Sequence, residues 1–168
     1  VFAMCGGYEN TFSRTKEESE LYRLNHRTEN EVAVSDDLYA LLACAKEYYD
    51  KTDGRFDISV APLSDIWDFK SENPKVPDAG QIKKVLEKVD YSLVHLEPDN
   101  TVRFDEQDTM LDLGALAKGY IADRLKEYLV SQGIERGFIN LGGNVLTIGE
   151  KEDGSPWEIG IQKPFAER

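Results

Sequence analysis

The sequence contains no run of about 18 apolar residues, so no segment of it is predicted to cross a membrane. It has only two cysteines, Cys5 and Cys44, which are too few for a disulfide framework or a cysteine-based zinc site. The phosphate-binding pattern GxxxxGK[ST] is absent, which excludes a P-loop. What remains is an ordinary globular chain of 168 residues, long enough for one domain with a substantial core.

Positive charge is also scarce. The chain has 20 Lys and Arg residues against 32 Asp and Glu residues, which gives a net charge of −12 at pH 7. Such a surplus of negative charge repels polyanions and disfavours a nucleic-acid partner. An enzyme that handles a phosphorylated substrate remains compatible with this charge only if a local site or a metal ion overcomes the repulsion.

The hydrophobic pattern predicts a mixture of helices and strands. Apolar residues at helical spacing predict helices over residues 36–53, 77–90 and 115–132, and Gly54 and Gly133 are placed to end the first and the last. Strand patterns cover residues 55–62, 110–111 and 156–164, and hairpins are predicted over residues 92–105 and 137–150. Because strict βαβ alternation is absent, we expect an α+β fold with a largely antiparallel sheet.

The stretch MLDLGALAKGYIAD, residues 110–123, changes from a strand pattern to a helix pattern at an aspartate and a glycine. The N–H groups at a helix start attract phosphate, and a free backbone oxygen near Ala115 would suit a hard cation such as Mg²⁺. Asp112 would then bind that metal or accept a hydrogen bond from a sugar or a base. The alternative is that Asp112 only caps the helix and that Lys118 is solvated.

Two further stretches allow both a structural and a functional interpretation. The glycines of NLGGN, residues 140–144, form either a tight turn or a backbone surface for a flat ligand. Asp57 interrupts an apolar run, so its carboxylate either points outward or is buried with a partner.

Six segments, taken in this order, resemble the ApbE family of FAD:protein FMN transferases. They are FAM (2–4), FSRTKEESELYRLN (12–25), GRFDISVAPLSDIWDF (54–69), LDLGALAKGYIADRL (111–125), FINLGGNVLTIG (138–149) and PWEIGIQKP (156–164). Each segment alone is a weak signal, but together they are specific. The resemblance implies that residues 1–168 are the N-terminal part of one ApbE-like domain, with a T-fold-like core that is incomplete at the C-terminus.

The resemblance implies an enzyme that moves FMN from FAD to a threonine hydroxyl of an acceptor flavoprotein and releases AMP, with Mg²⁺ as cofactor. Acceptors in the family include subunits of electron-transfer and sodium-pumping complexes. Members usually act outside the cytoplasmic membrane, often as lipoproteins, so a membrane-anchored extracytoplasmic protein is expected. One alternative is a relative that binds FAD, or hydrolyses it to FMN and AMP, without transfer. Another is an acidic interaction module that has no ligand.

The same resemblance implies the site residues. FAD contacts are expected at Met4, Arg55, Phe56, Asp57, Asp112, Lys118, Asn140, Gly142 and Gly143, and a metal-binding backbone oxygen is expected at Ala115. Thr15 departs from the family pattern, since many members carry there a tyrosine that stacks on the flavin. The family's later HxxDP-like and DAxxT-like segments, the second of which supplies metal ligands, do not occur in this sequence. We therefore expect a half-built metal site and catalytic residues outside this chain.

Overall fold

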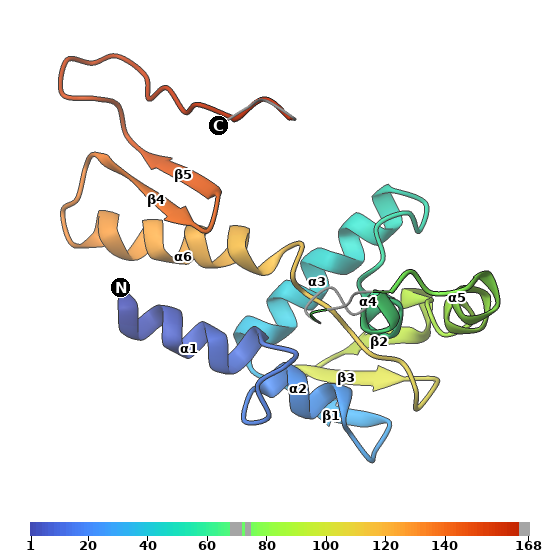
Figure 1. Cartoon of the computed structure of the whole chain (residues 1–168). Helices are drawn as coiled ribbons and strands as arrows, with labels where there is room; N and C mark the ends of the chain where they lie inside the picture. The colour runs from blue at the N-terminus through green and yellow to red at the C-terminus, as the bar shows by residue number, and fades with distance from the viewer. Residues whose placement is uncertain (68–71, 73–74, 165–168) are drawn as a thin grey trace. The chain divides into compact units, whose positions relative to one another are not determined.

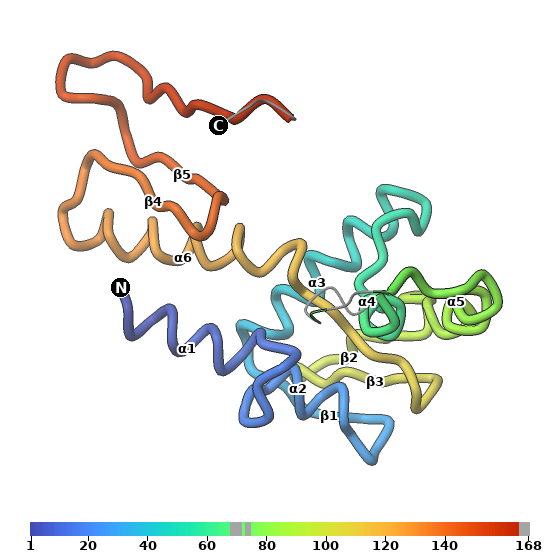
Figure 2. Tube along the Cα trace, in the orientation of Figure 1, coloured from blue at the N-terminus to red at the C-terminus, as the bar shows by residue number. Residues whose placement is uncertain are grey.

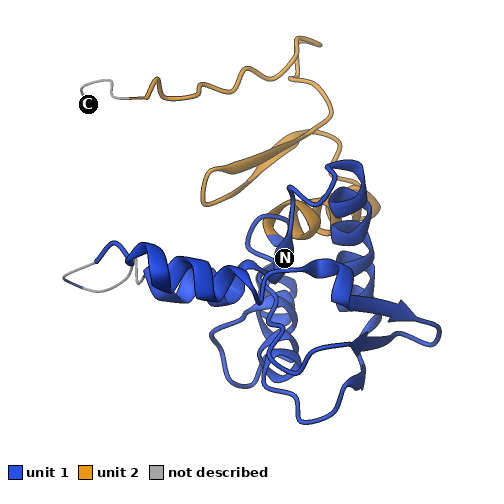
Figure 3. Ribbon diagram, turned by 90° about the vertical axis from the view of Figure 1, so that its right-hand side faces the viewer, with its two compact units in different colours: residues 1–117 blue, residues 118–168 orange. Residues whose placement is uncertain are grey.

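A computed structural model describes residues 1–67, 72 and 75–164. The chain divides into two compact units, residues 1–117 and residues 118–168 (Figure 3). Helices and short antiparallel strands are mixed along the sequence (Figures 1 and 2), so the predicted α+β class is confirmed. Within the described ranges, no helix is both long enough and apolar enough to cross a membrane.

The helices of the first unit begin at side-chain caps where the sequence provides them. These helices are α1 (Phe2–Phe12), α2 (Glu20–Asn25), α3 (Asp36–Lys51), α4 (Ala61–Trp67) and α5 (Ala79–Leu86), with short 3₁₀ helices η1 (Ile58–Val60) and η2 (Tyr91–Leu93). The Ser35 hydroxyl accepts the N–H of Leu38 at the start of α3, and Asp78 forms a capping box with Gln81 at the start of α5. The helices predicted over residues 36–53 and 77–90 are therefore confirmed. Helix α1 was not predicted, because Gly6 and Gly7 interrupt its pattern.

A three-stranded antiparallel sheet lies in the same unit. Its strands β1 (Glu31–Ala33), β2 (Val94–Glu97) and β3 (Thr101–Phe104) run in the order β1-β3-β2, and β2 and β3 form the predicted hairpin. Helix α3 is tied to the strands by two phenols: the Tyr39 hydroxyl donates to the Glu97 carbonyl at 2.9 Å, and that of Tyr91, in η2, donates to the Leu42 carbonyl at 3.0 Å. Both Tyr91 and Leu42 are fully buried, so the core lies between α3 and the strands.

Leu111 is fully buried but does not belong to a strand, contrary to the prediction for residues 110–111. The side-chain amide of Asn25, at the end of α2, takes the place of a strand partner. Its Nδ2 donates to the Leu111 carbonyl at 2.8 Å, and its Oδ1 accepts the Leu111 N–H at 2.7 Å. Both backbone groups of a buried residue are therefore satisfied without a ladder.

Arg27 holds the segment that leads into Leu111. Its guanidinium donates to the carbonyls of Leu24, Glu106, Gln107 and Thr109, and it lies over the Phe104 ring at 3.4 Å from the centroid. Burial lowers the pKa of Arg27 to about 10, which is still well above neutral, so the group remains charged. The loop before Asp112 is thus fixed by one cation that serves four carbonyls.

Residues 55–62 were predicted as a strand, and this prediction is wrong. They form a turn followed by η1 and the first residues of α4, because the Asp57 side chain caps the turn. Its Oδ1 accepts from the Ser59 N–H at 2.7 Å and from the Ser59 hydroxyl at 2.6 Å, while its Oδ2 accepts the Tyr91 N–H at 3.0 Å. Pro62 fits in the first turn of α4, where its missing N–H is not needed. Asp57 therefore links η1 to η2.

The second unit contains the predicted helix and hairpin. Helix α6 (Ala117–Ser131) is followed by Gly133, whose φ of +83° matches its predicted role as the helix stop. Strands β4 (Gly137–Leu141) and β5 (Asn144–Ile148) pair antiparallel. The predicted strand over residues 156–164 is wrong: this described segment carries no strand pairing, and Ile161 in it is 92% exposed. The alternation of apolar and polar residues predicted a strand, but such a pattern does not show whether a partner strand is present.

We predict that Asn25→Leu destabilises the full-length protein by about 2–3 kcal/mol, because it leaves the buried N–H and C=O of Leu111 without partners. Urea unfolding should show this as a lower transition midpoint with an unchanged slope. Asn30→Leu, at an exposed position, is the control and should change the midpoint little. Equal midpoints for Asn25→Leu and the unmodified protein would contradict the role assigned to Asn25.

Asp57→Asn should cost about 1–2 kcal/mol of folding free energy, since an amide oxygen can replace only one of the two accepting carboxylate oxygens. The same substitution at Asp53 is a matched control, because Asp53 is exposed and its φ of +52° is tolerated by asparagine. Thermal unfolding of the two variants of the full-length protein compares them directly. A shift of equal size for both would show that the links to Ser59 and Tyr91 contribute nothing.

Candidate functional site

Asp112 lies between two buried leucines, and only its side chain reaches the surface. Leu111 and Leu113 are at most 1% exposed, whereas the Asp112 side chain is 25% exposed. The Asp112 N–H donates to the Ile58 carbonyl at 2.7 Å, which joins this segment to η1. Carboxylate oxygen Oδ1 accepts the Gly114 N–H at 2.8 Å. This oxygen therefore closes the turn before α6 and does not cap the helix itself, which begins three residues later at Ala117.

Gly114 leaves room for this close approach. A Cβ at position 114 would lie 3.0 Å from Asp112 Oδ1, closer than ordinary van der Waals contact. The chain turns through residues 114–116 and enters α6 at Ala117. The aspartate and the glycine at this junction thus form one local structure, in which the glycine makes room for the carboxylate that it binds.

Arg14 pairs with the second oxygen of Asp112, an arrangement that sequence reasoning missed. Its Nε lies 2.9 Å from Asp112 Oδ2, and its Nη1 donates to Asp65 Oδ1, on α4, at 2.6 Å. Arg14 thereby joins three separate segments, the turn after α1, helix α4 and the start of the switch into α6. The only signal in the sequence was that Arg14 and Asp65 lie inside two of the six segments that resemble the family.

The electrostatics of this cluster are local and asymmetric. One guanidinium faces two carboxylates, so Arg14, Asp65 and Asp112 together carry a charge of −1 at neutral pH. The side chains of Arg14 and Asp112 are only about a quarter exposed, so salt screens their attraction less than it screens a fully exposed pair. The cluster can fix the direction of Asp112, but it does not attract an anion by charge alone.

Ala115 and Lys118 are exposed and flank the start of α6. Ala115 lies in the turn, where its backbone oxygen is the expected metal ligand, and Lys118 lies in the first helical turn. Across the described ranges, no three His, Cys, Asp or Glu side chains gather closely enough to hold a metal ion. One carbonyl falls far short of the near-octahedral oxygen shell of Mg²⁺, so the described residues do not make a magnesium site by themselves.

Other predicted FAD contacts of the first unit are spread over two elements. Met4 is half-buried on α1. Arg55 is exposed, and the Phe56 ring packs edge-on against Tyr48, at the C-terminal end of α3. Asp57 follows directly, and Ile58 then bonds to Asp112. The structure therefore brings the 55–57 segment next to Asp112.

The predicted residues of the second unit form the hairpin turn between β4 and β5. Gly142 and Gly143 have φ angles of +61° and +94°, which a two-residue hairpin loop of this kind requires. The Asn140 side chain accepts the Gly143 N–H at 2.9 Å and closes the turn. The structural interpretation of NLGGN is confirmed, and contact of these three residues with FAD stays a prediction.

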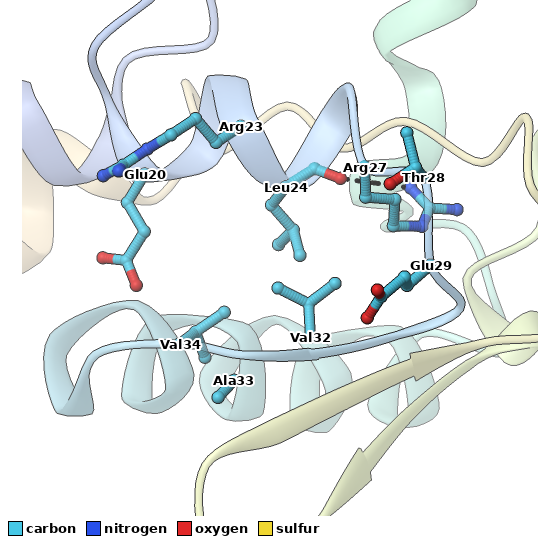
Figure 4. Close-up of a pocket in the computed structure, with 9 residues that line it drawn as sticks. All are labelled: Glu20, Arg23, Leu24, Arg27, Thr28, Glu29, Val32, Ala33 and Val34. Atoms are coloured by element: carbon cyan, nitrogen blue, oxygen red, sulfur yellow. Dashed lines mark hydrogen bonds between the residues drawn. The ribbon is translucent and has the colours of Figure 1, made fainter.

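The first unit also has a pocket of about 390 Å³ between α2 and β1 (Figure 4). Leu24 and Val32 face each other across it, and Glu20, Arg23 and Glu29 supply charged groups around it. None of the residues that line it is a predicted site residue. Its mixed charges favour no particular ligand, so the cluster around Asp112 is the candidate functional site.

The chain is similar to known proteins along nearly its whole length. The profile of the ApbE family matches residues 1–168. The chain is 38% identical over 169 residues to an FAD:protein FMN transferase of Klebsiella pneumoniae, with 99% of this chain and 52% of the relative covered. It is 33% identical over 159 residues to one of Vibrio cholerae, with 93% and 47% covered.

Solved structures give the same result. The structure of the flavin transferase ApbE from Vibrio cholerae matches with a TM-score of 0.89 and 30% identity, over 97% of this chain and 53% of that one. That of the ApbE protein from Thermotoga maritima matches with a TM-score of 0.89 and 31% identity, over 99% and 56%. The chain therefore spans about half the length of the relatives it matches. With a family match along its whole length, this chain belongs to the ApbE family.

Proposed function

We propose that the full-length protein is an Mg²⁺-dependent flavin transferase that moves FMN from FAD to a threonine hydroxyl of an acceptor flavoprotein. The observation that carries the proposal is the 38% identity, over 99% of this chain, to a relative named FAD:protein FMN transferase. As the family resemblance implies, the acceptor would be a subunit of an electron-transfer or sodium-pumping complex. The protein would act outside the cytoplasmic membrane, anchored as a lipoprotein.

In the proposed reaction, the threonine oxygen attacks the phosphorus on the riboflavin side of the FAD diphosphate. A new P–O bond forms, the diphosphate bridge breaks, AMP leaves, and the threonine loses its proton. Catalysis of such a transfer consists mostly of positioning and charge neutralisation. Bound Mg²⁺ would supply part of that neutralisation, with the Ala115 carbonyl as one of its ligands.

The residues of this chain would bind and orient FAD. Asp112 would accept a hydrogen bond from a hydroxyl or amino group of FAD, because each of its oxygens keeps acceptor capacity beyond its present partner. The first N–H groups of α6 and the Lys118 ammonium would face the diphosphate, which a helix start suits. These local donors would offset the overall negative charge of the chain.

A second candidate function is FAD binding, or hydrolysis of FAD to FMN and AMP, without transfer. The observation that favours it is Thr15, which is exposed and stands where many family members have a flavin-stacking tyrosine. A threonine offers no ring to hold the flavin, so the isoalloxazine would be less restrained. Products distinguish the two functions, because transfer needs an acceptor and leaves a covalent flavin.

The test of the proposal is to incubate the full-length protein with FAD, MgCl₂ and a candidate acceptor domain. We expect AMP release by chromatography, and an acceptor mass increase equal to one FMN less one water. The mass increase should disappear when the target threonine is alanine, and EDTA should stop it until excess Mg²⁺ is added. AMP release with free FMN and no acceptor adduct would favour the hydrolase; neither product would contradict both functions.

Asp112→Ala should weaken FAD binding to the full-length protein by about 10- to 100-fold, the loss expected for one hydrogen bond to a charged group. The quenching of flavin fluorescence on titration measures this affinity, and circular dichroism checks the fold. Asp108→Ala, which removes an exposed carboxylate paired with Lys88, is the matched control and should bind FAD normally. Normal affinity in Asp112→Ala would mean that Asp112 serves only to hold the turn before α6.

A further inference from the structure

We propose that Arg14 is a positioning residue for FAD, which fixes the Asp112 carboxylate in the direction that the substrate needs. This inference rests on the proposed function, in which Asp112 contacts FAD. Arg14 pairs with Asp112, a predicted FAD contact, and with Asp65, and is not itself a predicted FAD contact. Its effect on FAD would therefore pass through Asp112.

The backbone at Arg14 is held by the turn between α1 and α2. The Ser13 hydroxyl accepts the N–H groups of Thr15 at 3.3 Å and Lys16 at 3.2 Å, and the Ser13 carbonyl accepts the buried Ser19 hydroxyl. Ser19 in turn caps α2 by accepting the N–H of Tyr22 at 3.1 Å. The guanidinium of Arg14 therefore projects from a fixed turn rather than from a free loop.

Asp112 is held from three sides. Its N–H is bonded to Ile58, its Oδ1 to the Gly114 N–H, and its Oδ2 is paired with Arg14 Nε. Gly114 alone would leave the carboxylate free to tilt about that one bond. With both oxygens engaged, the remaining lone pairs have a defined direction, which preorganises the group for a ligand.

Arg14 also offsets the negative charges of Asp65 and Asp112. Without it, Asp65 and Asp112 would lie near each other with no shared cation, and two like charges would repel each other. They would also repel the diphosphate of FAD. The Asp65 arm matters less for the ligand, because that side chain is 51% exposed and water can solvate it.

The position of Arg14 in the chain links two parts of the predicted site. Thr15, the residue after it, stands at the family's flavin-stacking position, and Asp112 is a predicted FAD contact. The Arg14–Asp112 pair connects these two stretches of sequence, as the bonds between Asn25 and Leu111 also do. A residue in this place can fix where the Asp112 carboxylate lies relative to the turn that carries Thr15.

The test is a double-mutant cycle in the full-length protein with Arg14→Gln, Asp112→Asn and the double variant. FAD affinity is measured by fluorescence quenching, and the melting temperature is measured without FAD. We expect each single variant to bind FAD about 5- to 30-fold more weakly, and the double variant to be no weaker than the worse single one, within about twofold. Arg14→Lys, which keeps the positive charge but lacks the planar guanidinium with its several donors, should bind FAD more tightly than Arg14→Gln.

Two controls separate positioning from general stability. Asp108→Asn and Lys88→Gln each remove one partner of an exposed ion pair outside the cluster. Each should change FAD affinity by less than about twofold and leave the melting temperature nearly unchanged. Unchanged FAD affinity in Arg14→Gln, or penalties that multiply in the double variant, would overturn the proposal. If either result were found while the protein without substitutions still flavinylates its acceptor, the proposed function would stand and only the role of Arg14 would be rejected. Coupling without flavinylation would instead retain Arg14 as a positioning residue and reject the transfer.

Discussion

The pair of hydrogen bonds between the Asn25 amide and Leu111 is the constraint on which the candidate site depends. Leu111 is buried without a strand partner, so its backbone groups need that amide. Asp112 follows directly, and its own N–H is bonded to Ile58. The direction of Asp112 is therefore set by α2 on one side and by η1 on the other, before any contact of its carboxylate is made.

Although the net charge of the chain is −12, two arginines stabilise the backbone and the carboxylate at this position. Arg27 binds three carbonyls of the segment before Asp112 and one of α2, and Arg14 pairs with the Asp112 carboxylate. An acidic protein can bind a diphosphate only where hydrogen-bond donors, such as the free N–H groups at a helix start, and cations are concentrated. Under the proposed function that diphosphate is FAD, and the start of α6 is where we propose that it binds.

The sequence predicted the elements whose signal is local. Helices α3 and α5 have N-caps, α6 has a glycine stop, and both hairpins have turn residues, so each was found. The predictions failed where side chains from elsewhere in the sequence determine the backbone conformation. Asp57 turns an apolar run into a 3₁₀ turn by binding Ser59 and Tyr91, and Asn25 replaces a strand at Leu111. The Arg14–Asp112 pair was missed for the same reason, since spacing along the chain contains no information about it.

The most direct test of this account is a crystal structure of the full-length protein with FAD bound. The account predicts that one Asp112 oxygen lies within hydrogen-bond distance of FAD, with Arg14 Nε still next to the other oxygen and the Asn25 amide still on Leu111. The diphosphate should lie at the start of α6. An FAD bound elsewhere, with Asp112 contacting only Arg14 and Gly114, would contradict it.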